Sequence, residues 1–311
     1  MCGIAGIRKM DADGNIRPEQ LKLLALSLEY RGKDATGFAL QKASGEVLVH
    51  KAANSARVFV DLPATREFLA SHLSPDIVTA LVHTRAKTQG TPYKNENNHP
   101  MHSGTSAVVH NGHVWNDDEL FAASGLERKA ETDSDIIRAI FDRDGLTEAA
   151  LEPLREMTGS VASAIIHPDF PGQVMLLRSS NPLVVAGTDS QLIWASDMAS
   201  VYKTAPEWVT RWGIPMQLRS KLGVLPMPDD TAWMIGAEGK EWHREFKLSS
   251  YSYGYRPGKP PKQGRASGTW WPELIACPNK HSLRLKPKQR RLETLTGLHC
   301  TVCQADLVDP K

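Results

Sequence analysis

The sequence predicts an α+β protein whose sheets and helices stack as a layered sandwich, followed by a small cysteine-containing module. Up to about residue 248, short runs rich in Val, Ile, Leu and Ala come in succession, with helices grouped between them rather than strictly alternating with them. Then YSYGYRPGKPPKQGRASG, rich in Gly, Pro and Lys and without hydrophobic period, is typical of a linker. We expect a domain over 2–248, a linker over 249–269 and a tail over 270–311.

The expected strands are apolar runs that polar residues, Gly or Pro separate. They are Ile77–His83, Ser106–His110, Val161–His167, Gln173–Arg178 and Leu192–Ala195. Two segments instead follow a helical period. Pro18–Glu29 places leucines three to four residues apart, and Asp133–Asp144 follows Thr132, which is a plausible N-cap.

The composition is that of an ordinary globular protein. Of 311 residues, 41% are hydrophobic and 23% are charged, and the net charge is +2, which argues against a disordered or fibrous chain. No apolar run approaches the roughly 18 residues of a membrane span, and the N-terminus lacks the pattern of a secretory signal. We therefore expect a cytoplasmic protein that does not contact membranes.

The cysteine in MCGIAGI follows the start methionine directly. If Met1 is removed, Cys2 carries a thiol and an α-amine on one residue. An α-amine with a pKa of about 7.7–8.0 can take the proton of a thiol whose pKa is about 8.5. Nucleophile and base then come from a single residue. The alternative is a cysteine that stands at the second position by chance.

Further motifs occur in a fixed order along the first 200 residues. They are LEYRGKDATG, VHTRAKTQGTP, NNHPM, VVHNG, ETDSD, GSVASAII and WASD. Together with MCGIAGI, they resemble the class II glutamine amidotransferases, whose catalytic domain is of the N-terminal-nucleophile (Ntn) type. The resemblance covers roughly residues 2–200 and implies a four-layer αββα Ntn-hydrolase sandwich. It also implies hydrolysis of the side-chain amide of L-glutamine, with no cofactor for that step.

The resemblance assigns roles to two residues beside the nucleophile Cys2. Arg85, at the end of an expected strand, would grip the α-carboxylate of glutamine through its guanidinium fork, with Thr88 hydrogen-bonding nearby. On spacing alone, a surface arginine in a salt bridge is the better explanation of Arg85. Ala86 and Gln89 depart from the family, which often has an aromatic residue and a histidine at these positions. In the family this loop closes over glutamine, so we expect its closure in this protein to differ.

The remaining roles fall on two later motifs. Asn111 and Gly112, which follow an expected strand, would stabilise a developing oxyanion, although Asn-Gly is also a common hairpin turn. Asp133 would bind the α-ammonium group of glutamine. Its expected place at the start of a helix offers a competing explanation, since the helix dipole favours a carboxylate there.

The tail contains the other three cysteines. Two pairs of possible ligands, Cys277-x3-His281 and Cys300-x2-Cys303, are separated by eighteen residues. This spacing fits a structural Zn²⁺ site like that of a zinc ribbon, with His299 as a rival ligand. Alternatively, the cysteines are unligated thiols. From Arg256 to Glu293 there are ten Lys or Arg residues against two acids. Such a patch is typical of a surface that binds nucleic acid, of one that binds an acidic partner, or of a solvated linker.

Three functions remain open from the sequence. The first is a glutamine-hydrolysing subunit that supplies ammonia to a separately encoded synthetase, because no GxxxxGK[ST] phosphate loop and no acceptor domain is recognisable. The second is a stand-alone Ntn hydrolase of another γ-glutamyl amide. The third is an inactive scaffold whose zinc tail binds nucleic acid.

Overall fold

The computed structural model describes residues 1–187, 190–204, 225–236, 239–249, 274–276 and 282–284. The chain divides into two units, Met1–Ser252 and Tyr253–Lys311. In the second unit, strands β14 (Leu274–Ala276) and β15 (Ser282–Arg284) pair antiparallel. The four expected zinc ligands lie outside the described residues, as does the basic stretch apart from these two strands.

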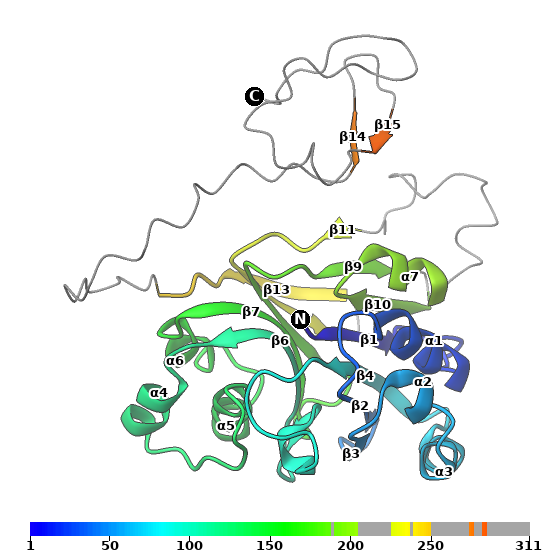
Figure 1. Cartoon of the computed structure of the whole chain (residues 1–311), viewed down its shortest axis with the longest axis horizontal. Coiled ribbons are helices and arrows are strands. Elements are labelled where there is room, and N and C mark those ends of the chain that lie inside the picture. Colours follow the sequence, from blue (N-terminus) through cyan, green and yellow to red (C-terminus); the bar gives the residue numbers. More distant parts are fainter. Residues whose placement is uncertain (188–189, 205–224, 237–238, 250–273, 277–281, 285–311) are drawn as a thin grey trace, which may run out of the picture. The chain divides into compact units, whose positions relative to one another are not determined.

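Two antiparallel sheets form the centre of the first unit (Figure 1). The seven-stranded sheet has the order β11-β9-β10-β1-β4-β2-β3, and the six-stranded sheet has the order β13-β12-β8-β7-β6-β5. The strands of the first sheet are β1 Gly3–Lys9, β2 Ala35–Lys42, β3 Val47–Ala52, β4 Ile77–Arg85, β9 Val184–Gly187, β10 Gln191–Ala195 and β11 Leu225–Pro226. Those of the second are β5 Met101–His102, β6 Ala107–Val114, β7 Gly159–Ile166, β8 Val174–Ser179, β12 Thr231–Gly236 and β13 Gly239–Glu245.

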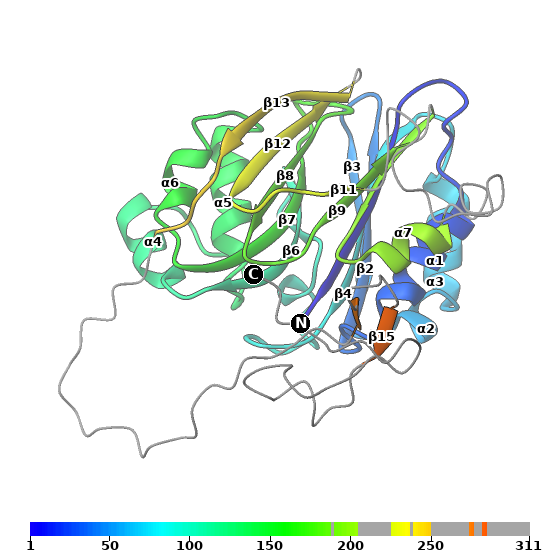
Figure 2. The ribbon, with the colours of Figure 1, turned by 90° about the horizontal axis from the view of Figure 1, so that it is seen from above.

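Helices cover the outer face of each sheet (Figure 2). The seven-stranded sheet is covered by α1 Pro18–Leu28, α2 Ala56–Phe59, α3 Pro63–His72 and α7 Met198–Thr204. The six-stranded sheet is covered by α4 Asp117–Ser124, α5 Asp135–Asp144 and α6 Leu151–Arg155. A short 3₁₀ helix, Asn95–Asn97, lies in the loop before β5. No helix in the described part of the chain is both long and apolar enough to cross a membrane.

Three apolar clusters hold these layers together. One joins the seven-stranded sheet to its helices, for example through Leu24 of α1 and Val82 of β4. A second joins the six-stranded sheet to α4–α6. The third is built from residues of the strands and their connections and fills the space between the sheets. The expected layered α+β arrangement with two antiparallel sheets is therefore confirmed.

The middle cluster shows which strand residues face the space between the sheets. Ile4 of β1, Leu81 of β4 and Val109 of β6 all belong to it. Because side chains alternate along a strand, every second residue from these points to the same space. This alternation points the side chains of Cys2, His83, Arg85 and Asn111 into the layer between the two sheets. All four lie at the same end of that layer.

The five expected strands and both expected helices are present, with ends that differ by a few residues, and two of these differences concern the site. Asn111 and Gly112 do not follow a strand but lie inside β6, opposite Ala162 and Val161 of β7, so the hairpin-turn interpretation is wrong. Neither Asn nor Gly favours strands by itself, and pairing with a central neighbouring strand outweighs that preference.

Helix α5 begins at Asp135, two residues later than expected. Ser134, not Thr132, occupies the N-cap position. Asp133 therefore lies in the loop that precedes the helix rather than in its first turn.

Close packing at the centre of the domain depends on Gly6 of β1. A Cβ atom at this position would lie 2.2 Å from the ring of Trp194 and 2.7 Å from the carbonyl oxygen of Ala80. Both neighbours belong to the strands on either side of β1, and Trp194 is fully buried. The small residue thus lets the central strand sit beneath a large aromatic side chain.

We predict that Gly6→Ala lowers the free energy of unfolding by about 1–3 kcal/mol, because the added methyl group overpacks the core. Urea denaturation followed by tryptophan fluorescence measures the change. The control Ala122→Ser alters an exposed position of α4 and should stay within about 0.5 kcal/mol of the parent protein. Equal stabilities of the two variants would contradict the packing described.

Candidate active site

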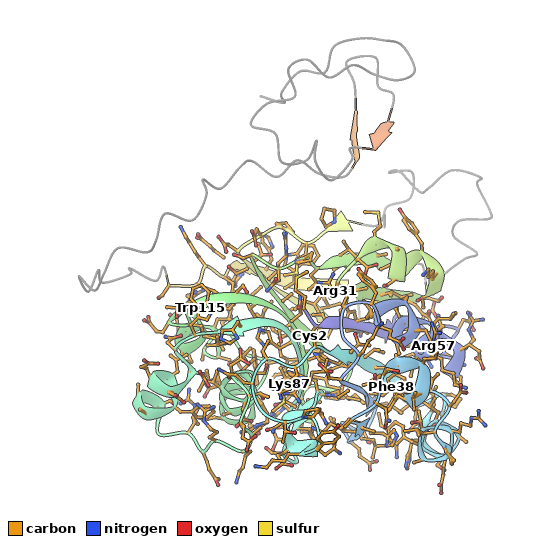
Figure 3. The ribbon with its side chains drawn as sticks, in the orientation of Figure 1. Cys2, Arg31, Phe38, Arg57, Lys87 and Trp115 are labelled. Carbon is orange, nitrogen blue, oxygen red and sulfur yellow. The ribbon has the colours of Figure 1, made fainter. Side chains whose placement is uncertain are left out.

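Cys2 precedes the first residue of the central strand β1, which pairs with β4 on one side and β10 on the other. Its Sγ lies 3.4 Å from the backbone nitrogen of Ala86 and 3.6 Å from the carbonyl oxygen of the same residue. Arg31 donates from Nε to the carbonyl oxygen of Cys2 at 2.9 Å, and Figure 3 marks both residues. The thiol is therefore held against the residue that directly follows β4.

The segment RGKD supports this end of β4. A Cβ atom on Gly32 would lie 2.3 Å from the carbonyl carbon of Arg85, so the backbones meet there without room for a side chain. Asp34 accepts a hydrogen bond at 2.7 Å from the backbone of Lys87, and its own N–H donates to the carbonyl of Arg85 at 2.9 Å. These contacts fix the position of Ala86, and with it the backbone beside the thiol.

Arg85 is the last residue of β4 and is only 2% exposed. Its Nη1 donates to Oδ1 of Asn98 at 2.8 Å, and its Nη2 donates to the carbonyl oxygens of Gln89 and of Gly90, the latter at 3.0 Å. Arg85 is thus not the surface arginine of the alternative interpretation. Its fork is engaged by its own loop, so a bidentate grip on a carboxylate requires Nη2 to release these carbonyls.

The backbone of β6 presents polar groups along the edge that faces away from β7. Residues opposite each other in an antiparallel pair alternate between hydrogen-bonded and non-hydrogen-bonded positions. Trp115 donates to the carbonyl of Thr158 across the β6–β7 register at 2.9 Å. Odd-numbered residues of β6 therefore bond to β7, and the N–H of Gly112 points to the opposite edge.

The neighbours of Gly112 confirm this direction. The carbonyl oxygen of His110 lies 3.0 Å from Nε2 of His83, and the N–H of Val114 donates to Oδ2 of Asp133 at 2.7 Å. Both partners come from outside β7. The Gly112 N–H lies between these two occupied groups on the same edge of the strand.

Asn111 supplies a second donor at this place. Its side chain is 2% exposed, and Nδ2 has no hydrogen-bond partner among the described residues. A buried donor without a partner costs about 1–3 kcal/mol. An acceptor atom of a bound molecule would recover that energy.

Asp133 contacts both β6 and the loop that follows β4. Besides the bond to Val114, Nδ1 of His113 lies 3.6 Å from Oδ2 of Asp133, and the Asp133 N–H donates to Oε1 of Gln89 at 3.1 Å. Its carboxylate is thus directed to the edge of β6 and not to the dipole of α5. A cationic group of a ligand would bind through the other oxygen, Oδ1.

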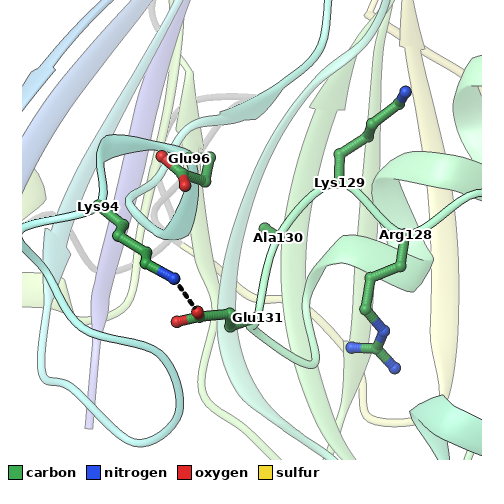
Figure 4. A pocket seen from close by; sticks show the side chains of 6 residues that line it. All are labelled: Lys94, Glu96, Arg128, Lys129, Ala130 and Glu131. Carbon is green, nitrogen blue, oxygen red and sulfur yellow. Dashed lines mark hydrogen bonds and ion pairs between the residues drawn. The ribbon is translucent and has the colours of Figure 1, made fainter.

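The loop between β4 and β5 is tied to the segment that carries Asp133. Lys94 forms an ion pair with Glu131, and Asn97 exchanges two hydrogen bonds of 2.8 Å with the same glutamate. A shallow hollow of about 260 Å³ lies between loop and segment (Figure 4). Its lining residues are Lys94, Glu96, Arg128, Lys129, Ala130 and Glu131. Thr88, in the same loop, is exposed.

Two buried histidines lie behind this loop. The rings of His83 and His99 stack with their centroids 4.1 Å apart. Burial lowers the pKa of His83 to about 3 and that of His99 well below its ordinary value, so both rings are neutral at physiological pH. The two rings therefore add no charge near Arg85.

Burial raises the pKa of the Cys2 thiol above its ordinary value. The N–H of Ala86, the charged N-terminus and Arg85 act in the opposite direction but more weakly, and the charge of Asp133 adds to the increase. The thiol is therefore protonated at neutral pH. Attack by this sulfur requires a base that takes its proton.

Contacts connect Cys2, Arg85 and Asp133 through neighbouring residues, whereas no such contact includes Thr88 or the side chain of Asn111 among the described residues. Cys2 touches Ala86, Arg85 donates to Gln89, Gln89 accepts from Asp133, and Asp133 binds the edge of β6 beside Gly112. From the sequence, no role was assigned to Asn98, His83 or His113, which lie in or beside the motifs without a distinctive pattern of their own, or to Asn181, which lies outside the motifs. In the part of the chain that the structure describes, no group of three or more His, Cys, Asp or Glu residues could hold a metal ion.

Comparison with known proteins adds an independent line of evidence. A family model described as "Glutamine amidotransferase domain" matches residues 83–203. The glutamine–fructose-6-phosphate aminotransferase (isomerizing) of Gluconobacter oxydans is 30% identical over 264 residues, which are 79% of this chain and 41% of that protein. The enzyme of the same name from Acinetobacter baylyi is 32% identical over 220 residues, which are 67% of this chain and 33% of that protein.

Solved structures share the fold. The glutamine phosphoribosylpyrophosphate amidotransferase of B. subtilis aligns with a TM-score of 0.57 and 16% identity over 80% of this chain and 50% of that chain. A structure described as the allosteric regulatory enzyme of purine biosynthesis aligns with a TM-score of 0.58 and 18% identity over the same shares. The chain spans less than half the length of the two aminotransferases. By its motifs, its family match and its curated relatives, the chain carries a class II glutamine amidotransferase domain.

Proposed function

We propose that this domain hydrolyses the side-chain amide of L-glutamine and releases glutamate and ammonia, with Cys2 as the nucleophile. The observation that supports the proposal is that strand alternation directs a half-buried thiol and unpartnered or edge-facing donors to the same end of the middle layer. Cys2 comes from the start of β1, and the donors Asn111 and Gly112 come from β6 of the other sheet.

Binding begins at the amino-acid head of the substrate. Arg85 takes the α-carboxylate once Nη2 exchanges the carbonyls of Gln89 and Gly90 for it, and Asp133 takes the α-ammonium group through Oδ1. Thr88 adds a hydrogen bond from the same loop. Before this exchange, Gln89 contacts both Arg85 and Asp133 and so connects the two parts of the site that receive the head group.

The attack on the amide needs a base, since the pKa of the thiol is raised. Removal of Met1 places an α-amine on Cys2 itself, and this amine accepts the thiol proton directly or through water. Met1 is 78% exposed, which leaves it open to a processing enzyme. The sulfur then forms a bond to the side-chain carbonyl carbon of glutamine.

The negative charge that develops on the carbonyl oxygen is stabilised by Nδ2 of Asn111 and by the N–H of Gly112. Each such donor is typically worth about 2.7–4 kcal/mol of barrier lowering. The α-ammonium of Cys2 gives its proton to the departing nitrogen, and the C–N bond breaks. Water, deprotonated by the same amine, cleaves the resulting γ-glutamyl thioester, which frees glutamate and restores the thiol.

For the ammonia we propose transfer to a synthetase encoded separately. Support for transfer comes from the curated relatives, whose printed names pair glutamine with an acceptor, fructose-6-phosphate. A synthetase that accepts the ammonia should raise glutamate release when mixed with this protein and its own substrates.

For the tail we propose a structural Zn²⁺ held by Cys277, His281, Cys300 and Cys303. Support comes from the spacing of the two ligand pairs and from the small size of the segment, which has too few residues for a sizeable apolar core. The ion would stabilise the fold of the tail and take no part in glutamine hydrolysis.

The nucleophile is tested with protein whose Met1 has been removed. We predict glutamate release from glutamine by this form, loss of at least about 10³-fold for Cys2→Ala, and comparable loss when a tag or Met1 remains ahead of Cys2, because no α-amine then adjoins the thiol. Coupled glutamate dehydrogenase assays measure the rates. Equal rates with and without Met1 would exclude the α-amine as the base, and preference for larger γ-glutamyl amides over glutamine would favour the stand-alone hydrolase.

The zinc site is tested by metal analysis of the full chain purified without chelator. We predict one zinc ion per chain and its loss in the double variant Cys300→Ser/Cys303→Ser, because two of four ligands are removed. The matched control Cys2→Ser changes a cysteine of the other unit and should keep the metal. Zinc-free parent protein, or a double variant that retains zinc, would contradict this site.

A further inference from the structure

We propose that Asn181 is a positioning residue for the oxyanion donors, since it orients and polarises the peptide bond between Asn111 and Gly112. The inference rests on the proposed function, because it concerns the same donors. Asn181 lies in the turn between β8 and β9, which no motif of the sequence singles out. Its contact with β6 bridges 70 positions of the chain.

The contact itself is a hydrogen bond to a backbone oxygen. Nδ2 of Asn181 donates to the carbonyl oxygen of Asn111 at 3.1 Å. That oxygen belongs to the same peptide unit as the N–H of Gly112. In a planar trans peptide the C=O and the N–H point in opposite directions. The ladder with β7 already places this oxygen on the β7 side and the N–H at the open edge of β6, and the bond from Asn181 further restrains that orientation.

The same bond changes the strength of the donor. A hydrogen bond accepted by a peptide oxygen polarises the unit and makes its N–H a better donor, since bonds in a chain reinforce one another. The Gly112 N–H is the group proposed to face the oxyanion. Asn181 thus acts on the reaction through this peptide and does not touch the substrate.

The turn that carries Asn181 is held in place by several independent contacts. Arg178 donates from Nε to the carbonyl oxygen of Asn181 at 2.9 Å, and the N–H of Ser180 donates to Oδ1 of Asp229 at 2.6 Å. Ser180 also forms a parallel bridge with Val161, the residue opposite Gly112. These contacts bring the turn to the place where β6 carries the donors.

The backbone of this turn is also strained. Ser180 has φ = 68°, in the left-handed region that residues with a Cβ atom rarely adopt. Such conformations cost about 1–3 kcal/mol and persist where surrounding contacts enforce them. Here the enforced conformation presents the side chain of the next residue, Asn181, to the carbonyl of Asn111.

The sequence permits a direct observation of this peptide. Asn111–Gly112 is the one Asn-Gly pair in the 311 residues. Protein labelled with ¹³C on Asn carbonyls and ¹⁵N on Gly gives a single carbonyl–amide correlation in an NMR experiment. That signal reports the Asn111 carbonyl and the Gly112 amide together, in the full chain and without substrate.

We expect Asn181→Ala to move both resonances upfield, as loss of a hydrogen bond to the carbonyl requires. Asn181→Asp, which keeps the shape but replaces the donor with an oxygen, should move them at least as far. The control Asn116→Ala removes a similar bond, from Nδ2 to the carbonyl of Glu156 at 2.9 Å, and should leave the signal in place.

Kinetics provide the second readout. We expect kcat for glutamine hydrolysis to fall about 3- to 10-fold in Asn181→Ala, the equivalent of one hydrogen bond, with KM changed less than about twofold. Asn116→Ala should keep the kcat of the parent. A rise in KM at unchanged kcat would mean that the turn serves substrate binding, and it would overturn the proposal.

The two readouts separate the inference from the function on which it rests. A stationary carbonyl–amide signal in both Asn181 variants overturns the positioning role, whatever the activity. Parent protein without Met1 that fails to hydrolyse glutamine overturns the proposed function, while the NMR signal still decides whether Asn181 orients the peptide. Moved resonances together with a reduced kcat support the proposal.

Discussion

The site depends on the register of β1 between its neighbours. Ile4 opposes His83 of β4, and the alternation of side chains then directs Cys2, Arg85 and their neighbours toward the space between the two sheets. A slip of one residue would send Cys2 to the helical side. Gly6, beneath the buried ring of Trp194, is what lets β1 occupy this central position. Packing at the middle of the strand therefore determines chemistry at its end.

The middle layer changes from apolar to polar at the site. Ile4, Leu81 and Val109 fill its interior, whereas Arg85 and Asn111 at its end bury polar groups. Some of these groups have partners on their own loop, as the guanidinium of Arg85 does, and Nδ2 of Asn111 has none among the described residues. Burying such donors lowers the stability of the fold. Because these donors are already in place, they can stabilise charge that develops in a reaction, as the proposed function requires.

Much of the fold and the positions of several site residues were predictable from the sequence. Apolar runs predicted β4 with Arg85 at its end, and periodic leucines predicted α1. The strand location of Asn111 and Gly112 was not predictable, because local preference gave a turn and pairing with β7 overrode it. The contact of Asn181 was also missed, since it joins segments 70 positions apart, and the bond from Arg85 to Asn98 within one loop leaves no local pattern either. The roles of the predicted residues and the zinc site stay predictions.

The central claim is that Cys2 becomes acylated by glutamine. Protein without Met1 is mixed with glutamine, quenched in acid within one turnover, digested and analysed by mass spectrometry. The account predicts a glutamyl group on the peptide that begins with Cys2, absent from Cys2→Ala and removed by mild base as expected for a thioester. Turnover of glutamine with an unmodified Cys2 peptide at every quench time, or a glutamyl group on another residue, would contradict it.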